Sequence, residues 1–449
     1  MRPLKRSTGA RSSFPVPSHF GGWAPGRGAD VVVVGAGIIG AACADELAAA
    51  GLDTVVVDRT GIGAGTTGAG EGNILVSDKE PGPELALALL SRALWQRFGA
   101  ELAAGSVPGT ESLHRRRLGD PSTGPGDSGI ALEAKGGLVV ATGADGLAGL
   151  HQLAASQRAA GVVAEPVGPD RARALEPQLT PDLAGGVHYP QDMQVQPVLA
   201  AATLLRRARA NGARLVTGRP VTGFGRDRTG RITSVRTPAG AIATRYVVNA
   251  AGLGAREVAA LAGVHLPIQP RRGFILVTEP LPPMIRGKVY DAAYVADVAS
   301  DDRTLQTSTV VEATDGGTIL IGASRERVGL DPALRVDVLA RLARQAIRLF
   351  PALTGVRAIR AYRGFRPYSP DHLPVIGADP DVAGLLHAAG HEGAGIGLAP
   401  ATGLLIRQMV TGVTPELDPA PFRPGRPALR RVAVPAPTRA APNGPGGVR

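Results

Sequence analysis

Three glycines and one aspartate near the start of the chain have the types and spacing that bind a dinucleotide. Gly35, Gly37 and Gly40 form a G-x-G-x-x-G pattern after an apolar run, and Asp58 ends the next apolar run. In this pattern the first glycine permits a tight turn, the second lets the backbone approach a pyrophosphate, and the third lets a helix touch a strand. Asp58 would accept hydrogen bonds from an adenosine ribose and repel a 2′-phosphate, which argues against NADP.

A βαβ unit must position these residues. The sequence predicts a buried strand over 31–34, an Ala-rich helix over 38–50 that Gly51 stops, and a second buried strand over 54–58. The crossover between the two strands is expected to be right-handed. A pyrophosphate would then rest at the helix N-terminus, where free amides and the helix dipole favour negative charge.

Helical and extended patterns alternate along the rest of the chain. Helices are expected over 84–102, 145–160, 197–211, 332–349 and 396–411. Extended segments are expected over 130–142, 214–217, 220–226, 232–237, 241–249, 274–278, 318–321 and 382–389, and the whole span 268–324 favours strands. The alternation predicts an α/β fold, α+β overall.

Length and charge exclude several classes of protein. With 449 residues, 44% of them hydrophobic, the chain is long enough for two or three globular units. The net charge of +11 comes from the ends, because 1–29 hold five basic residues, 423–449 hold six, and neither range has an acid. Aromatic residues are only 4% of the chain, so there is little to stack on bases and no nucleic-acid partner is expected.

The single cysteine and the apolar runs indicate the compartment. Cys43 alone cannot form an intrachain disulfide or a cysteine-built zinc site, and no metal site is expected. The basic N-terminal segment has no continuous apolar core, and the uncharged run 31–44 is shorter than the roughly 20 residues that span a bilayer. We expect a soluble, cytoplasmic protein without a transmembrane segment.

Four further stretches of small residues accompany the first motif. They are the glycine-rich loop 61–73, the strand end 247–254, the segment 363–377 that contains Gly-Phe-Arg-Pro, and the segment 391–403, in which glycines begin a helix. Together these motifs resemble the FAD-dependent oxidoreductases of the D-amino acid oxidase superfamily. The similar branch contains glycine oxidase, sarcosine oxidase and the dehydrogenase subunits that act on D-amino acids or opines.

The resemblance runs from about residue 30 to 415 and implies a domain organisation. A discontinuous, Rossmann-like FAD-binding domain is expected over 30–115, 190–265 and 360–415. An interleaved, mostly antiparallel substrate domain is expected over 116–189 and 266–359. The ends, 1–29 and 416–449, are rich in Pro, Gly, Ala and Arg and are expected to be disordered tails.

The resemblance also implies which residues bind non-covalent FAD. The adenosine and pyrophosphate side is expected to include the first motif, the basic residue after Asp58 and an adenine contact: Gly35, Gly37, Ile38, Ile39, Gly40, Asp58, Arg59 and Val221. The flavin side is expected to include the threonine loop, the strand end and the glycine turn: Thr66, Thr67, Ala251, Gly252, Gly393, Gly395 and Ile396.

Three residues are the catalytic candidates. Arg366 corresponds to the arginine that pairs with the substrate carboxylate in glycine oxidase-like enzymes, and the alternative is an arginine that bridges the two domains. Tyr294 and Tyr290 both lie where such enzymes place a tyrosine over the substrate, and the sequence leaves the choice open. His391 could tune the flavin or could simply be hydrogen bonded. Arg325 is a further charged residue expected near the flavin ring, and a structural role is favoured for it.

The implied activity is oxidation of the CH–NH bond of a small amino acid or secondary amine, of the glycine, sarcosine or D-amino acid type, by hydride transfer to flavin N5. Cys43 lies on the first helix, far from the position of covalent attachment in monomeric sarcosine oxidases. Only Lys288 lies in the central substrate region, and it does not match an oxygen-activating lysine. Two alternatives therefore stay open: an oxygen-independent subunit of an opine, hydroxyproline or amine dehydrogenase with an electron-accepting partner, and a non-catalytic flavin-binding scaffold.

Overall fold

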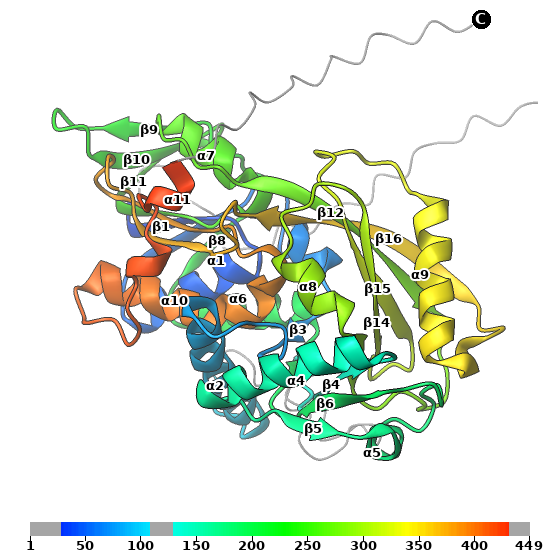
Figure 1. The fold of residues 1–449 in the computed structure, drawn as a ribbon. Helices are drawn as coiled ribbons and strands as arrows, with labels where there is room; N and C mark the ends of the chain where they lie inside the picture. The colour runs from blue at the N-terminus through cyan, green and yellow to red at the C-terminus, as the bar shows by residue number, and fades with distance from the viewer. Residues whose placement is uncertain (1–27, 108–128, 431–449) are drawn as a thin grey trace, which may run out of the picture.

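Two sheets of eight strands each form the framework of the residues that the structure describes, 28–107 and 129–430. In this computed structural model the first sheet and its helices lie beside the second sheet, several of whose strands are at the right of Figure 1. Helices cover both sheets, and the predicted α/β class is confirmed.

The first sheet is built around β1 (Ala29–Val34), in the order β17-β18-β11-β1-β2-β8. β1 pairs in parallel with β11 and with β2, so Val32 lies opposite both Val247 and Val55. The other strands are β2 (Thr54–Val57), β8 (Arg214–Val216), β11 (Gly240–Asn249), β17 (Val375–Ala378) and β18 (Leu385–Ala389), with β9 (Gly223–Arg226) and β10 (Ile232–Thr237) attached through β11.

The predicted βαβ unit is confirmed. Val31, Val32 and Val33 have no exposed surface, as expected for a strand covered on both faces. α1 (Ile38–Ala49) connects β1 to its parallel neighbour β2. Gly51 follows this helix with φ of +80°, a conformation that glycine adopts without steric cost, so the helix ends where the sequence predicted.

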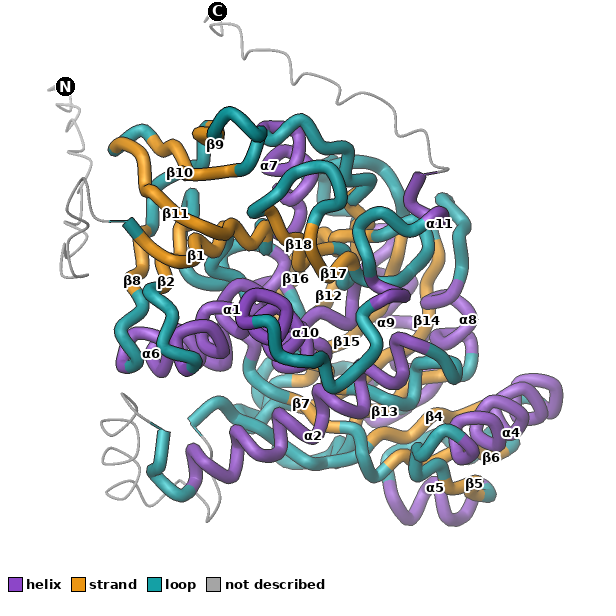
Figure 2. The backbone as a smooth tube through the Cα atoms, turned by 90° about the vertical axis from the view of Figure 1, so that its left-hand side faces the viewer, coloured by secondary structure: helices purple, strands orange, loops and turns teal. Residues whose placement is uncertain are grey.

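Four helices cover one side of the first sheet. α1, α6 (Pro197–Ala210) and α10 (Gly395–Thr411) lie together below its strands in Figure 2, and α2 (Pro83–Ala103) packs against α10. A Cβ atom on Gly403 would lie 2.5 Å from the carbonyl oxygen of Ala42, so α10 and α1 approach each other more closely than larger side chains would allow. On the opposite side, α7 (Ala255–Leu261) contacts β9 and β11.

The second sheet runs in the order β16-β12-β15-β14-β13-β4-β6-β5 and is antiparallel except between β13 and β4. Its strands are β4 (Gly137–Ala141), β5 (Glu165–Val167), β6 (Gly185–Tyr189), β12 (Gln269–Thr278), β13 (Lys288–Asp291), β14 (Gln306–Ala313), β15 (Ile319–Arg325) and β16 (Ala358–Tyr368). β3 (Asn73–Ile74) and β7 (Met193–Gln194) form a separate two-stranded antiparallel sheet.

Helices of the second sheet lie on different strands. α9 (Val336–Leu349) packs on β12, β14 and β15, as Figure 1 shows, whereas α4 (Ala144–Ala159) and α5 (Pro169–Leu175) contact β5 and β6. α8 (Ala293–Ala299) contacts β14. The expectation of strands throughout 268–324 was therefore wrong at α8, because seven residues are too few for periodicity to separate a helix from a strand.

Two expected boundaries differ from the structure. β16 pairs with β12 along its length, so the second sheet continues to Tyr368, beyond the position 360 at which the FAD-binding domain was expected to resume. The predicted strand over 382–389 begins at Leu385, because the Asp379 carboxylate accepts hydrogen bonds from the amides of Asp381 and Val382 and holds a turn there.

The expectation of a disordered tail from residue 416 was wrong for its first part. Phe422 has no exposed surface, and Leu429, in α11 (Pro427–Arg430), packs in a core cluster with Ile268 and Val375. Arg426 donates to both carboxylate oxygens of Asp371, at 2.6 and 2.8 Å. The predicted tails over 1–27 and 431–449 lie outside the described residues.

Within 28–107 and 129–430, no helix combines the length and the apolar character needed to cross a membrane.

Candidate active site

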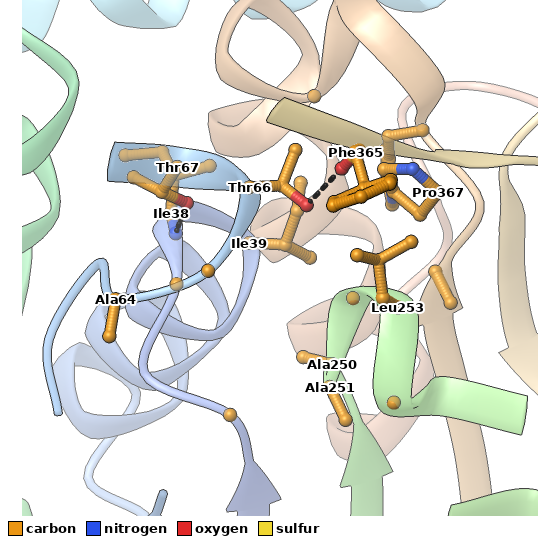
Figure 3. Close-up of a pocket in the computed structure, with 18 of the residues that line it drawn as sticks. Ile38, Ile39, Ala64, Thr66, Thr67, Ala250, Ala251, Leu253, Phe365 and Pro367 are labelled. Atoms are coloured by element: carbon orange, nitrogen blue, oxygen red, sulfur yellow. Dashed lines mark hydrogen bonds between the residues drawn. The ribbon is translucent and has the colours of Figure 1, made fainter. Parts of the chain in front are cut away.

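A cavity of about 400 Å³ lies where the two sheets meet. Its walls come from the carboxyl ends of β1, β2 and β11, from the loop after β2, from β16 and from the start of α10. In Figure 3, Ile39 of α1, Thr66 of the loop and Phe365 and Pro367 of β16 gather around one space. Open parallel sheets bind their ligands at this edge.

The three glycines of the first motif have different neighbours. A Cβ on Gly35, which has φ of +115°, would lie 2.4 Å from the carbonyl oxygen of Ala250, and one on Gly40 would lie 1.9 Å from the carbonyl oxygen of Gly35. These two glycines let backbone segments touch. A Cβ on Gly37 would meet only the Thr67 hydroxyl, at 3.2 Å, and Gly37 lines the cavity. Its missing side chain therefore leaves space that protein does not fill.

Asp58 holds the turn of this motif. One carboxylate oxygen accepts a hydrogen bond from the Ala36 amide at 2.8 Å, and the other accepts from the Thr60 amide at 2.7 Å. Asp58 and the neighbouring Arg59 both line the cavity, with Val221 near them among the lining residues. The carboxylate is thus fixed at the end of β2, facing the cavity.

Two adjacent threonines connect the turn to the second sheet, and both hydrogen bonds appear in Figure 3. The Ile38 amide, in the first turn of α1, donates to the Thr67 hydroxyl at 3.0 Å. The Thr66 hydroxyl donates to the carbonyl oxygen of Phe365 on β16 at 2.8 Å. The loop after β2 is therefore anchored at both of the sheets that enclose the cavity.

All of the predicted cofactor residues except Gly40 line this cavity. The structure brings together Gly35, Gly37, Ile38, Ile39, Asp58, Arg59, Thr66, Thr67, Val221, Ala251, Gly252, Gly393, Gly395 and Ile396. Gly40 faces the strand instead. At the start of α10, the Trp95 indole donates to the carbonyl oxygen of Ile396 at 3.0 Å, which fixes the first turn of that helix.

Arg366 lines the cavity without a carboxylate partner. Its Nη1 donates to the carbonyl oxygen of Ser324 at 3.0 Å, and no acid of the described residues lies within ion-pair distance of its guanidinium. Burial and the nearby positive charge of Arg325 lower the pKa of Arg366 from its ordinary value. Because both influences disfavour the charged form, an anion in the cavity would be stabilised beside it.

Arg325, close to Arg366, is a second arginine that has no carboxylate partner in the described part of the chain. Arg325 is 4% exposed, and its guanidinium carbon lies 4.5 Å from the centre of the Tyr294 ring. The other arginines buried to this degree in the described part of the chain, Arg271, Arg272 and Arg426, are all ion paired. The structure therefore concentrates positive charge around Tyr294.

The structure distinguishes the two tyrosines that the sequence left open. Tyr294 lines the cavity, whereas Tyr290 has no exposed surface and donates its hydroxyl to the Ser77 hydroxyl. The two rings lie 4.9 Å apart, so Tyr290 packs on one side of Tyr294 while Arg325 lies over its ring. Of the pair, only Tyr294 can contact a ligand in the cavity.

His391 lines the cavity as an uncharged group. Its Nε2 lies 3.0 Å from the Thr402 hydroxyl, which itself donates to the carbonyl oxygen of Leu398. Burial lowers the pKa of His391 to about 3. The ring is therefore both a cavity wall and a hydrogen-bonded link to α10.

Glu392 was missed in the sequence. It lines the cavity, has φ of +46°, and forms an ion pair with Arg271, which has no exposed surface. Burial alone would raise its pKa, but the His372 imidazole, whose Nδ1 lies 3.4 Å from the carboxylate, and the charge of Arg271 bring the pKa of Glu392 down to about 2. Its partners come from β12 and from the loop after β16, so nothing in the local sequence indicated the pair.

Glu71 was also missed as a cavity residue, although it belongs to the predicted glycine-rich loop. Cys43 and Lys288 are placed away from the cavity wall. Cys43 has no exposed surface, and burial raises the pKa of its thiol. Lys288 is 2% exposed and donates to Glu312 and Asn73.

Known proteins are similar to this chain in sequence and in fold. Residues 30–409 match the DAO family, described as FAD dependent oxidoreductase. Glycine oxidase of Geobacillus kaustophilus is 28% identical over 396 residues, which are 88% of this chain and 96% of that protein. Its crystal structure superposes with a TM-score of 0.76, covering 89% of this chain and 99% of the other.

Two further similarities differ in extent. The hydrogen cyanide synthase subunit HcnC of Pseudomonas aeruginosa is 35% identical over 269 residues, which span 59% of this chain and only 60% of that subunit. The L-proline dehydrogenase of P. horikoshii is 22% identical, with a TM-score of 0.77 over 89% of this chain and 97% of the other, and it shares the fold.

Replacing Glu392 by Gln should lower the free energy of unfolding at pH 7 by about 3 kcal/mol, because the charge that faces buried Arg271 is removed. The folded-state pKa of Glu392 is depressed, so its contribution is present above the unfolded pKa of about 4.3 and is lost as pH falls toward about 2. Urea unfolding of parent and variant between pH 7 and pH 3 should show the difference shrinking. Glu257→Gln, at a cavity residue without an ion pair in the described chain, is the control; a constant difference would contradict the assignment.

Proposed function

The chain belongs to the DAO family of FAD-dependent oxidoreductases, and we propose that it oxidises the CH–NH bond of a small amino acid or secondary amine of the glycine, sarcosine or D-amino acid type. One observation carries this proposal. The cavity that contains the dinucleotide motif also contains Arg366, a half-buried guanidinium without a carboxylate partner in the described residues. A planar fork of donors suits a carboxylate in two-point contact.

The residues of the cavity fit FAD. Gly37 leaves open space beside the first turn of α1, as a diphosphate requires, and the Asp58 carboxylate faces the same end of the cavity. The adenosine and diphosphate would be held by Gly37, Ile38, Ile39, Asp58, Arg59 and Val221. The flavin would be held by Thr66, Thr67, Ala251, Gly252, Gly393, Gly395 and Ile396. Attachment is non-covalent in this proposal, because buried Cys43 does not line the cavity.

When bound, FAD supplies an acceptor, at flavin N5, for the hydride that leaves the amine-bearing carbon of the substrate. The chain's own residues bind and orient. Arg366 would pair with the substrate carboxylate and so fix the direction of the neighbouring carbon. Tyr294 would contact the substrate from the side of α8. The neutral His391 would keep the cavity wall near α10 uncharged.

Water then completes the reaction by adding to the carbon–nitrogen double bond of the oxidised substrate. The products are an oxo acid and either ammonia or a free amine. The amides at the start of α10 would stabilise negative charge that develops near Gly395 and Ile396, since a helix N-terminus carries partial positive charge.

Anaerobic reduction of the flavin tests this function. At least one member of a panel of glycine, sarcosine, D-amino acids, proline derivatives and opines should bleach the absorbance of the oxidised flavin in the purified holoenzyme. If every amine leaves the spectrum unchanged, the proposal is overturned and a non-catalytic flavin-binding role gains support.

A dehydrogenase subunit with an electron-accepting partner is a second candidate. The similarity to a hydrogen cyanide synthase subunit favours it, because a protein named as a subunit works with other chains. Steady hydrogen peroxide formation by the isolated chain would reject this candidate. Turnover only with an artificial electron acceptor would support it.

Arg366→Ala should weaken binding of carboxylate substrates by about 3 kcal/mol, because a buried anion would lose its charged donor. The dissociation constant is measured from the substrate dependence of anaerobic flavin reduction. Arg366→Lys should retain part of the affinity, since a point charge replaces the two-point contact. Arg363→Ala, at an exposed arginine of the same strand, is the matched control. Equal affinity in parent and Arg366→Ala would remove Arg366 from the substrate site.

A further inference from the structure

Glu71 is a buried carboxylate on the cavity wall with an unused hydrogen-bonding position. Its side chain is 9% exposed and lines the cavity. Its Oε2 accepts a hydrogen bond from the Asn73 side chain at 3.0 Å, whereas its Oε1 is buried and has no hydrogen-bond partner. A buried oxygen in this state costs free energy unless a ligand supplies a donor.

Some buried carboxylates of this fold are saturated by the protein, whereas Glu312 Oε1 and Asp291 Oδ1, which lie away from the cavity wall, are buried without a hydrogen-bond partner as Glu71 Oε1 is. Glu176 is 2% exposed and accepts hydrogen bonds from the amides of Arg286 and Gly287. Asp192 has no exposed surface, and its two oxygens accept from the Val76 amide and the Ser77 hydroxyl. Glu71 differs from Glu312 and Asp291 because it lines the cavity, where a ligand can supply the missing donor.

Glu71 and a second carboxylate, Glu312, both lie near one buried ammonium, that of Lys288. The Lys288 ammonium lies 3.9 Å from Glu71 and 3.1 Å from Glu312, and it also donates to Asn73 at 2.7 Å. Two carboxylates therefore share one ammonium. Burial raises the pKa of Glu312, whose exposed fraction is 0% and which does not line the cavity. Of the two carboxylates, Glu71 is the one that lines the cavity, together with Asn73, which is bonded to both Glu71 and Lys288.

The position of Glu71 complements that of Arg366. The loop after β2 follows the second sheet: Thr66 is bonded to Phe365, and Glu71 Oε1 would lie 2.7 Å from a Cβ on Gly322 of β15. Arg366, on β16, and Glu71, on the loop after β2, thus present opposite charges to the same cavity. An amino acid carries a carboxylate and an amine that match this polarity, while a 2-hydroxy acid carries only the carboxylate.

We propose that Glu71 is the specificity-determining residue that recognises the substrate's amine group, with Oε1 accepting a hydrogen bond from the amine nitrogen and facing its positive charge. The site then selects amines over 2-hydroxy acids with the same carbon skeleton. A hydroxyl group could donate one hydrogen bond but would bring no positive charge to face the Glu71 carboxylate. This inference rests on the proposed function, which makes an amine the substrate.

The test compares Glu71→Gln with the parent holoenzyme, using the best amine substrate of the panel and its 2-hydroxy acid analogue. The amine's dissociation constant comes from anaerobic flavin reduction, and the hydroxy acid's inhibition constant comes from competition with the amine. Glu71→Gln should weaken amine binding by about tenfold or more, as expected for loss of a charged hydrogen bond. The inhibition constant of the hydroxy acid should change by less than about threefold.

Controls separate recognition of the amine from general damage. Glu71→Asp keeps the charge and should keep the preference for the amine over the hydroxy acid. If Glu71→Gln folds poorly, the inference is tested on Glu71→Asp alone. Glu80→Gln alters an exposed acid that does not line the cavity and should leave both constants unchanged. Retained FAD content is measured for every variant after gel filtration.

Each result has one meaning. If Glu71→Gln weakens both ligands equally, or weakens neither, the inference is wrong while flavin reduction by the amine leaves the proposed function standing. Loss of the amine preference in Glu71→Asp would also overturn it. If no amine reduces the parent's flavin, the proposed function itself fails, and the inference fails with it.

Discussion

Close backbone contact at the turn between β1 and α1 determines the geometry of the whole cavity. Gly40 leaves no room for a Cβ against Gly35, so the start of the helix is pressed onto the end of the strand. With α1 fixed there, its Ile38 amide reaches the Thr67 hydroxyl, and the adjacent Thr66 reaches β16. The side chains of the second sheet are thereby placed relative to the dinucleotide motif through three short contacts.

Positive and negative side chains lie on different parts of the cavity wall, so the cavity has an electrostatic polarity. Arg325 and Arg366 lie on two strands of the second sheet without carboxylate partners among the described residues, while Glu71 adjoins Glu312 on another part of that sheet. Coulomb interactions are stronger in a cavity shielded from water than at a surface. A small zwitterion entering the cavity would therefore be oriented by long-range attraction before it made its short contacts. Such orientation is what a reaction at one carbon atom requires.

Local backbone constraints explain which parts of the site could be predicted from the sequence. The glycine motif was recognisable because only glycine fits at Gly35, where φ is positive and a carbonyl group is close. The family assignment is confirmed by the match over 30–409. The glycine motif is adjacent in the sequence to the strand and the helix that it joins. The βαβ unit at the centre of the first sheet, and the cavity edge that it forms, were therefore predictable in outline.

Residues whose role depends on distant partners were not predictable. The sequence could not separate Tyr290 from Tyr294; in the structure Tyr290 is bonded to Ser77, far away in the chain, whereas Tyr294 lines the cavity. Glu71 depends on Lys288 in the same way. Glu392 gives the clearest physical case, because an acid at the start of α10 would cancel the positive potential of that helix N-terminus. Arg271 neutralises the Glu392 carboxylate, so the amides that follow it keep their attraction for negative charge in the cavity.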